Sequence, residues 1–178
     1  ICQQFNTTLL HISTDFVFDG SKTTPYLESD ITNPQSVYGT TKRDGELAII
    51  NTMQAYFIIR TSWLYSQFGN NFMKTMLRLA HEKTSLSVVD DQIGSPTHAV
   101  DLAAMLMTII QSKSTAYGIY HFSNQGNTSW YGFAQKIFEL NKVLIPLHPI
   151  ATAQYPTPAK RPQYSVLDVS KIESTFKV

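Results

Sequence analysis

Residues 11–46, HISTDFVFDGSKTTPYLESDITNPQSVYGTTKRDGE, are the stretch that decides the fold of this chain. Residues 7–14, which lead into it, are apolar and β-branched, as in a strand buried on both faces of a parallel sheet. Asn33 and Pro34 predict a helix that runs to about Asn51, because Asn caps helices and Pro suits their first turn. A strand followed by such a helix predicts an α/β fold, in which ligands bind beyond the carboxyl ends of the strands.

Three side chains of this stretch form a candidate acid–base site. Tyr38 and Lys42 lie four residues apart in the predicted helix and therefore share one of its faces. A phenol exchanges its proton poorly at neutral pH, whereas a neighbouring ammonium stabilises the phenolate. Thr14 ends the predicted strand and can hold the oxygen of a substrate carbonyl. Taken alone, Thr14 would more often only start a turn, and a Tyr and a Lys at this spacing also occur by chance.

Six motifs in order along the chain carry a resemblance to a known enzyme family. They are STDFVFDG, NPQSVYGTTK, RTSWLY, GNNFMKTMLRLA, DQIGSPT and YPTPAKRPQYSVLD. Together they resemble the extended short-chain dehydrogenase/reductases and, among these, the dTDP-4-dehydrorhamnose reductases, over nearly the whole chain. The resemblance implies reduction of the nucleotide sugar dTDP-4-dehydro-L-rhamnose to dTDP-L-rhamnose, with NADPH or NADH as cofactor. It also implies a cytoplasmic enzyme of nucleotide-sugar and cell-surface polysaccharide biosynthesis.

The resemblance implies a role for each residue of the expected site. The expected catalytic residues are Thr14, Tyr38 and Lys42. The expected cofactor contacts are Ser13, Tyr38, Lys42, Thr61 and Ser62. The expected substrate contacts are Thr14, Asp15, Phe16, Tyr38, Trp63, Asn71 and Arg161.

Several of these residues also have a simpler interpretation. Phe16 stands where many relatives have Tyr, so a hydrogen bond from that hydroxyl is missing here. A Trp that follows a strand, as Trp63 does, is more often packing. Asn70 is the predicted cap of the next helix, and capping alone would explain one Asn at this place. Arg161 offers a planar donor fork suited to a phosphate, but its proline-rich segment could equally be a stiff surface loop.

The predicted fold class is α/β, part of a doubly wound parallel-sheet (Rossmann-like) domain with a small discontinuous α+β substrate lobe. Residues 1–62 and 94–122 are predicted to form the C-terminal half of the dinucleotide-binding domain, and residues 63–93 and 123–178 the lobe. No two of the eight Gly lie closer than six residues, so the Gly-rich phosphate loop of such domains is missing from the sequence. We therefore expect a fragment whose cofactor loop lies upstream of Ile1, with little or no activity of its own.

Composition narrows the partners of the chain. Its 178 residues are 43% hydrophobic and carry a net charge of +1, which gives no basic excess for nucleic acid or for an acidic membrane surface. No apolar run is long enough to span a membrane. One cysteine excludes an internal disulfide, as is common in the cytoplasm. The five His are scattered, so the sequence predicts no metal site. The resemblance allows a Mg²⁺ ion but gives no residues that would bind it. A homodimer is also possible.

Three further residues receive structural interpretations. Glu46 is predicted to lie mainly at the surface or at an interface, Arg60 to be a paired or snorkelling residue of a strand end, and His121 to be a core histidine.

Two other classes of protein share much of this pattern. Nucleotide-sugar epimerases and dehydratases share the Tyr and Lys core but consume no cofactor. The regulatory subunit of methionine adenosyltransferase resembles these reductases and acts as a binding partner. The presence of Thr14, Tyr38, Lys42 and Trp63 together argues against that second alternative.

Overall fold

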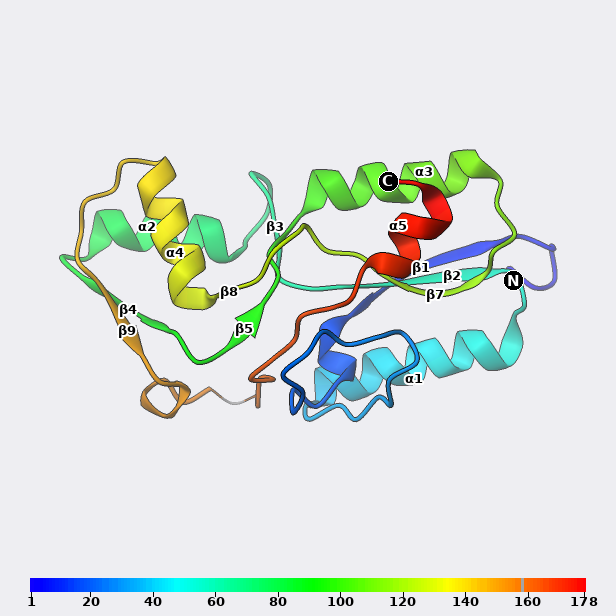
Figure 1. The fold of residues 1–178 in the computed structure, drawn as a ribbon, viewed down its shortest axis with the longest axis horizontal. Helices are drawn as coiled ribbons and strands as arrows, with labels where there is room; N and C mark the ends of the chain where they lie inside the picture. The colour runs from blue at the N-terminus through cyan, green and yellow to red at the C-terminus, as the bar shows by residue number, and fades with distance from the viewer. Residues whose placement is uncertain (158) are drawn as a thin grey trace.

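The computed structural model describes residues 1–157 and 159–178, and a parallel sheet lies at its centre. Its strands are β1 (Leu9–Thr14), β2 (Tyr56–Thr61) and β7 (Gly118–His121), in the order β1-β2-β7. Helix α1 (Val37–Thr52) covers one face, and helices α3 (Ala99–Ser112) and α5 (Ser170–Phe176) cover the other (Figure 1). The predicted α/β class with parallel strands is therefore confirmed.

The main core lies between the sheet and helices α3 and α5. Phe57 and Ile59 of β2 point into it and pack with Leu102, Met105 and Ile172. Ile58, between them, is also fully buried, so that β2 is covered on both faces as its apolar sequence predicts.

A second, smaller body joins the carboxyl end of the sheet. Strands β4 (Leu86–Val89) and β9 (Leu147–Ile150) form a parallel pair, and helices α2 (Phe72–Glu82) and α4 (Trp130–Leu140) pack on it through apolar side chains. Two short pairings connect the bodies: β3 (Leu64–Tyr65) with β6 (Thr97–His98), and β5 (Ile93–Gly94) with β8 (Thr128–Ser129). In Figure 1 the strands β1, β2 and β7 all run toward this second body.

The C-terminal segment differs from the predicted division of the chain. Residues 123–178 were assigned to the lobe, yet the last part of this range packs on the sheet. Leu167 forms a bridge with Tyr26, and Ile172 is completely buried against Phe57 and its neighbours. The reason is that α5 has one apolar stripe, which covers the open face of β7 beside α3.

The helix predicted from Asn33 and Pro34 begins later than expected. Helix α1 starts at Val37 because Ser36 is its cap, with the Ser36 Oγ accepting from the Gly39 N–H at 3.1 Å. Asn33 instead donates its side-chain amide to Asp19 at 3.3 Å. Helix α3 starts at Ala99 because the two residues before it are used in the pairing of β6 with β3.

The expected surface position of Glu46 is wrong, whereas the core position of His121 is confirmed. The exposed fractions of Glu46 and His121 are 2% and 0%. Glu46 pairs with Arg60 of β2, as described below.

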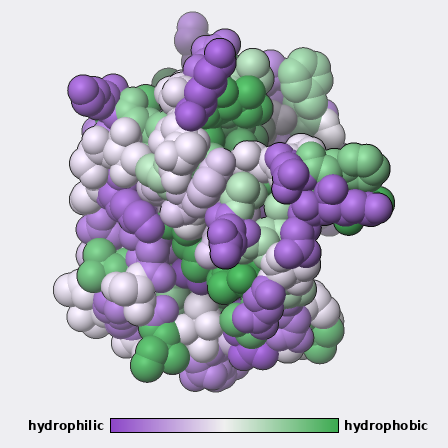
Figure 2. Space-filling model, turned by 90° about the vertical axis from the view of Figure 1, so that its right-hand side faces the viewer, coloured by the Kyte–Doolittle hydropathy of each residue, from purple (hydrophilic) through white to green (hydrophobic). Residues whose placement is uncertain are grey.

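The surface mixes polar and apolar side chains. Figure 2 shows this for the end of the molecule where β1, β2 and β7 begin. None of the helices that the structure describes is both long enough and apolar enough to cross a membrane.

Candidate functional site

Helix α1 crosses the carboxyl end of β1 and brings two predicted catalytic residues there. Gly39 packs against the backbone carbonyl of Phe16, where a side chain would not fit. The ring of Tyr38 meets the ring of Phe16 edge-on, with centroids 5.7 Å apart. The ammonium of Lys42 donates to the carbonyl oxygen of Ile12 at 2.6 Å. Lys42 thus bonds β1 before Thr14, and Tyr38 contacts the turn after Thr14 while remaining 54% exposed.

Thr14 is held by two hydrogen bonds at the start of the 3₁₀ turn Asp15–Val17. Its hydroxyl oxygen accepts from the Phe16 N–H at 3.2 Å, and its hydroxyl donates to Asp15 Oδ1 at 3.0 Å. Burial raises the pKa of Asp15 to about 6, against smaller opposing effects of hydrogen bonds from Ser165 and Thr14. Asp15 is only 2% exposed. The structure therefore gives Asp15 a role other than the predicted substrate contact. Its buried carboxyl accepts the hydrogen bond of the Thr14 hydroxyl and so orients that hydroxyl.

The predicted cofactor residues at the strand ends fall into two groups. The hydroxyls of Ser13 and Thr61 are buried and have no hydrogen-bond partner among the described residues. Buried hydroxyls without partners are uncommon, so these two are candidates for contacts with a bound group. Ser62, in contrast, donates to the carbonyl oxygen of Ser95 at 2.7 Å and fastens the strand end to the loop before β6.

Trp63 connects the end of β2 to the second body. Its indole stacks on that of Trp130, with centroids 3.6 Å apart and planes 6° from parallel. The backbone of Trp63 has a φ of 45°, a left-handed conformation that costs a bulky residue about 1–3 kcal/mol. Gly94 makes room for the indole, since a Cβ there would lie 2.5 Å from the ring. This packing therefore fixes a strained residue at the boundary of the two bodies.

Arg161 is linked to Trp63 through Trp130. Its guanidinium lies 6.0 Å from the centre of the Trp130 ring, within the range of a cation–π contact. The structure thus brings together two predicted substrate residues by way of one that the sequence analysis missed. A sequence signal for Trp130 is its place directly after Ser129, which caps α4 at the body that carries Arg161.

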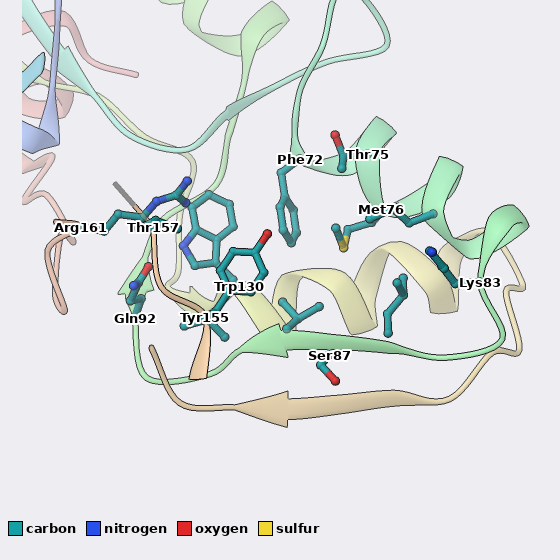
Figure 3. A pocket seen from close by; sticks show the side chains of 14 residues that line it. Phe72, Thr75, Met76, Lys83, Ser87, Gln92, Trp130, Tyr155, Thr157 and Arg161 are labelled. Atoms are coloured by element: carbon teal, nitrogen blue, oxygen red, sulfur yellow. The ribbon is translucent and has the colours of Figure 1, made fainter. Parts of the chain in front are cut away.

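A cavity of about 620 Å³ lies between α2 and β4. Helix α2 and strand β4 line it mainly with apolar side chains, among them Met76, Leu79 and Val88, and Lys83 and Ser87 also border it. At one end the rings of Phe72, Trp130 and Tyr155 lie near Gln92 and Arg161 (Figure 3). An apolar wall with a few polar groups at one end is the usual composition of a small-molecule site.

Asn71, one of the expected substrate contacts, has a structural role at the start of α2. It caps α2 in place of Asn70, with its Oδ1 accepting from the Lys74 N–H at 3.2 Å. Its amide donates to the carbonyl oxygens of Ser66 and Phe68 at 2.7 and 3.2 Å. Both amide hydrogens are therefore already used.

Within residues 1–157 and 159–178, no group of three His, Cys, Asp or Glu side chains is placed so that it could hold a metal ion.

Comparison with known proteins gives a consistent set of relatives. The dTDP-4-dehydrorhamnose reductase of Aggregatibacter actinomycetemcomitans is 47% identical over 183 residues, which cover 97% of this chain and 62% of that protein. The crystal structure of dTDP-4-dehydrorhamnose reductase from Bacillus anthracis, in complex with NADP, matches with a TM-score of 0.94 at 41% identity. The reductase structure from Clostridium acetobutylicum matches with a TM-score of 0.93 at 43% identity.

The two structural matches cover 98% of this chain and 61% of each reductase. The chain thus spans about three fifths of the length of the relatives it matches. The RmlD substrate binding domain family matches residues 1–178. On this match over the whole chain, the protein belongs to the RmlD substrate binding domain family.

Proposed function

We propose that the complete protein reduces the 4-keto group of dTDP-4-dehydro-L-rhamnose to give dTDP-L-rhamnose. The observation that carries this proposal is the placement of Lys42 and Tyr38 on either side of Thr14. Lys42 bonds Ile12 of β1, and the ring of Tyr38 contacts that of Phe16 in the turn after β1. The reductase from Aggregatibacter actinomycetemcomitans, at 47% identity, supports the choice of substrate.

In the proposed reaction the chain supplies the proton and holds the carbonyl oxygen. Tyr38 donates its phenolic proton to the oxygen at C4, and the nearby ammonium of Lys42 stabilises the phenolate that remains. Thr14 donates a hydrogen bond to the same oxygen, for which its hydroxyl must turn away from Asp15. Tyr38 is accessible enough for this role, since about half of its surface is exposed.

The donor set at the sheet end fits the nicotinamide half of a dinucleotide. Lys42 offers an ammonium for the ribose hydroxyls, and the unpartnered hydroxyls of Ser13 and Thr61 offer contacts nearby. When bound, the cofactor supplies a hydride to C4. We propose NADPH, because the Bacillus anthracis relative was solved with NADP. The Gly-rich turn that binds a pyrophosphate in dinucleotide-binding domains does not occur in this sequence.

The cavity of the second body suits the nucleotide part of the substrate. The rings of Phe72, Trp130 and Tyr155 provide apolar walls for a base. Arg161 provides a cation for the diphosphate, and Trp63 lies between this cavity and the catalytic end of the sheet. We further propose a cytoplasmic location, where nucleotide sugars and nicotinamide cofactors are available.

The test is the variant Tyr38→Phe in the complete protein, with dTDP-4-dehydro-L-rhamnose and NADPH. Loss of the acid should lower kcat about a hundredfold or more, with an unchanged melting temperature. Tyr117→Phe is the matched control, because Tyr117 lies just before β7, at the end of the sheet opposite the site. Its hydroxyl makes one long contact, 3.5 Å from the hydroxyl of Thr8. This control should keep wild-type kcat.

Three other results would contradict the proposal. A Tyr38→Phe variant with near-normal kcat would remove Tyr38 from its role. A wild-type protein that converts the sugar without net oxidation of NADPH would be an epimerase or a dehydratase. A protein that binds both ligands without turnover would be a binding subunit.

A further inference from the structure

A buried ion pair fastens the catalytic helix to the sheet. Glu46 lies one helical turn after Lys42, and its carboxylate binds the guanidinium of Arg60 in β2. Arg60 Nε lies 3.0 and 3.2 Å from the two carboxylate oxygens, and Nη2 lies 2.7 Å from Oε2. Their exposed fractions are 2% for Glu46 and 3% for Arg60. The pair therefore has the two-point geometry that restricts rotation as well as distance.

His121 completes this network on the far side of Arg60. Its Nδ1 lies 3.0 Å from the carbonyl oxygen of Tyr26, which can only accept, so Nδ1 carries the hydrogen. Its Nε2 lies 3.5 Å from Arg60 Nη1 and offers a lone pair. Burial and the neighbouring Arg60 lower the pKa of His121 to about 3, which keeps the ring neutral. The network thus runs from α1 through β2 and β7 to the segment around Tyr26.

Three contacts lie along one stripe of α1. Gly39 touches the turn after β1, Lys42 bonds the carbonyl of Ile12 in β1, and Glu46 bonds Arg60 in β2. Positions spaced by three and four residues share one face of a helix. Glu46 is therefore the third point of attachment of the face that also carries Lys42, and Gly39 and Glu46 are the two buried residues of α1.

Stability alone does not account for a buried pair. Removing two charges from water costs about as much as their attraction returns, and a well-packed apolar pair is often as stable or more stable. An apolar pair, however, does not fix the orientation of the helix. A bidentate pair allows one orientation of the helix, whereas apolar side chains allow several.

We propose that Glu46 and Arg60 are positioning residues for the reduction, which hold Tyr38 and Lys42 at the carboxyl end of β1 by fixing the orientation of α1. This inference rests on the proposed function, because it concerns the same catalytic helix. It assigns Glu46 and Arg60 no contact with substrate or cofactor.

The decisive test replaces both partners at once, with Glu46→Met and Arg60→Met in the complete protein. The melting temperature should stay at or above that of the wild type. The kcat should fall about tenfold to a hundredfold, because displacements near 1 Å at a catalytic group have effects of that size. The KM for the nucleotide sugar should change little, because its cavity lies in the other body. A double variant with wild-type kcat would overturn the proposal.

Ile109→Ala serves as the control for lost stability. Ile109 belongs to the core beneath α3, on the face of the sheet opposite α1. It should lower the melting temperature and leave kcat per folded molecule unchanged when measured well below that temperature. A parallel loss of kcat in this control would show that any destabilisation has the same effect, which would also overturn the proposal.

Arg60→Lys allows a second test, measured by hydrogen exchange. This test needs neither a folded double variant nor catalytic activity. It keeps the charge and removes the two-point geometry. Hydrogen exchange of the amides in residues 37–42 should become faster, while that of β2 stays as in the wild type. Unchanged exchange in residues 37–42 would overturn the inference. Wild-type protein without reductase activity would overturn the proposed function instead, so the two failures are distinct.

Discussion

Gly39 of α1 packs directly against the backbone carbonyl oxygen of Phe16, and no side chain would fit between them. A Cβ at this position would also lie 2.9 Å from the Cβ of Pro34. The contact places the first turn of the catalytic helix on the turn that follows β1. The next residue back, Tyr38, therefore meets the ring of Phe16.

This relationship predicts a large effect of Gly39→Ala. The added methyl group meets backbone, which cannot move out of its way as a flexible side chain would. The free energy of unfolding should fall by about 1–3 kcal/mol, as for other overpacked sites. The kcat of the complete protein should also fall, since Tyr38 moves with the first turn. Urea denaturation and steady-state kinetics measure the two effects.

Gly45→Ala is the control for this prediction in the same helix. A Cβ on Gly45 would have no neighbour within 4 Å. Alanine is the better helix former, so the free energy of unfolding should rise by about 0.8–1 kcal/mol with unchanged kcat. If Gly39→Ala and Gly45→Ala had the same free energy of unfolding and the same kcat, the contact of Gly39 with Phe16 would not be what makes position 39 sensitive.

Asp15 predicts a pH dependence of stability. Burial raises its pKa in the folded protein to about 6, from 3.8 in the unfolded chain. Between these two values the folded state binds a proton that the unfolded state has released, so this group makes the protein less stable as pH rises from 4 to 6. The loss amounts to about 3 kcal/mol and stays constant above pH 6.

Asp15→Asn isolates this contribution, because Asn resembles the neutral carboxyl and does not titrate. The difference in the free energy of unfolding between variant and wild type should grow in favour of the variant from pH 4 to pH 6 and then stay level. Denaturant unfolding at several pH values measures it. A difference that is constant over the whole range would mean that Asp15 is not held in its neutral form.

The sequence predicted the strands better than the helix starts. Residues 7–14 are apolar and β-branched, which predicts burial in a sheet, and β1 lies within them. Asn33 and Ser36 are both good caps, and local sequence does not choose between them. The choice is made by a contact with Asp19, 14 residues before Asn33.

Within the candidate site, too, some features follow from local sequence and others depend on tertiary contacts. Tyr38 and Lys42 lie four residues apart in one helix, so their place on the same face could be predicted from helix spacing. Glu46 is predicted to lie at the surface or at an interface because Lys42, one helical turn before it, is needed at the site. Its actual partner, Arg60, lies on another element. The stack of Trp63 on Trp130 joins residues 67 positions apart and depends on tertiary structure alone.

The stack of Trp63 on Trp130 predicts the outcome of Gly94→Ala. The indole of Trp63 occupies the space where the new methyl group would lie, so it must leave its parallel position. Two indoles with centroids 3.6 Å apart couple their electronic transitions, and the resulting feature of the circular dichroism spectrum should be present in the wild type and absent from the variant. The kcat/KM for the nucleotide sugar should fall, because Trp130 also supports Arg161 at the cavity. Gly45→Ala should leave the spectrum as it is. A Gly94→Ala protein with the wild-type spectrum would show that the stack does not depend on the close approach of Gly94, and the link from the sheet end to the cavity would then need another origin.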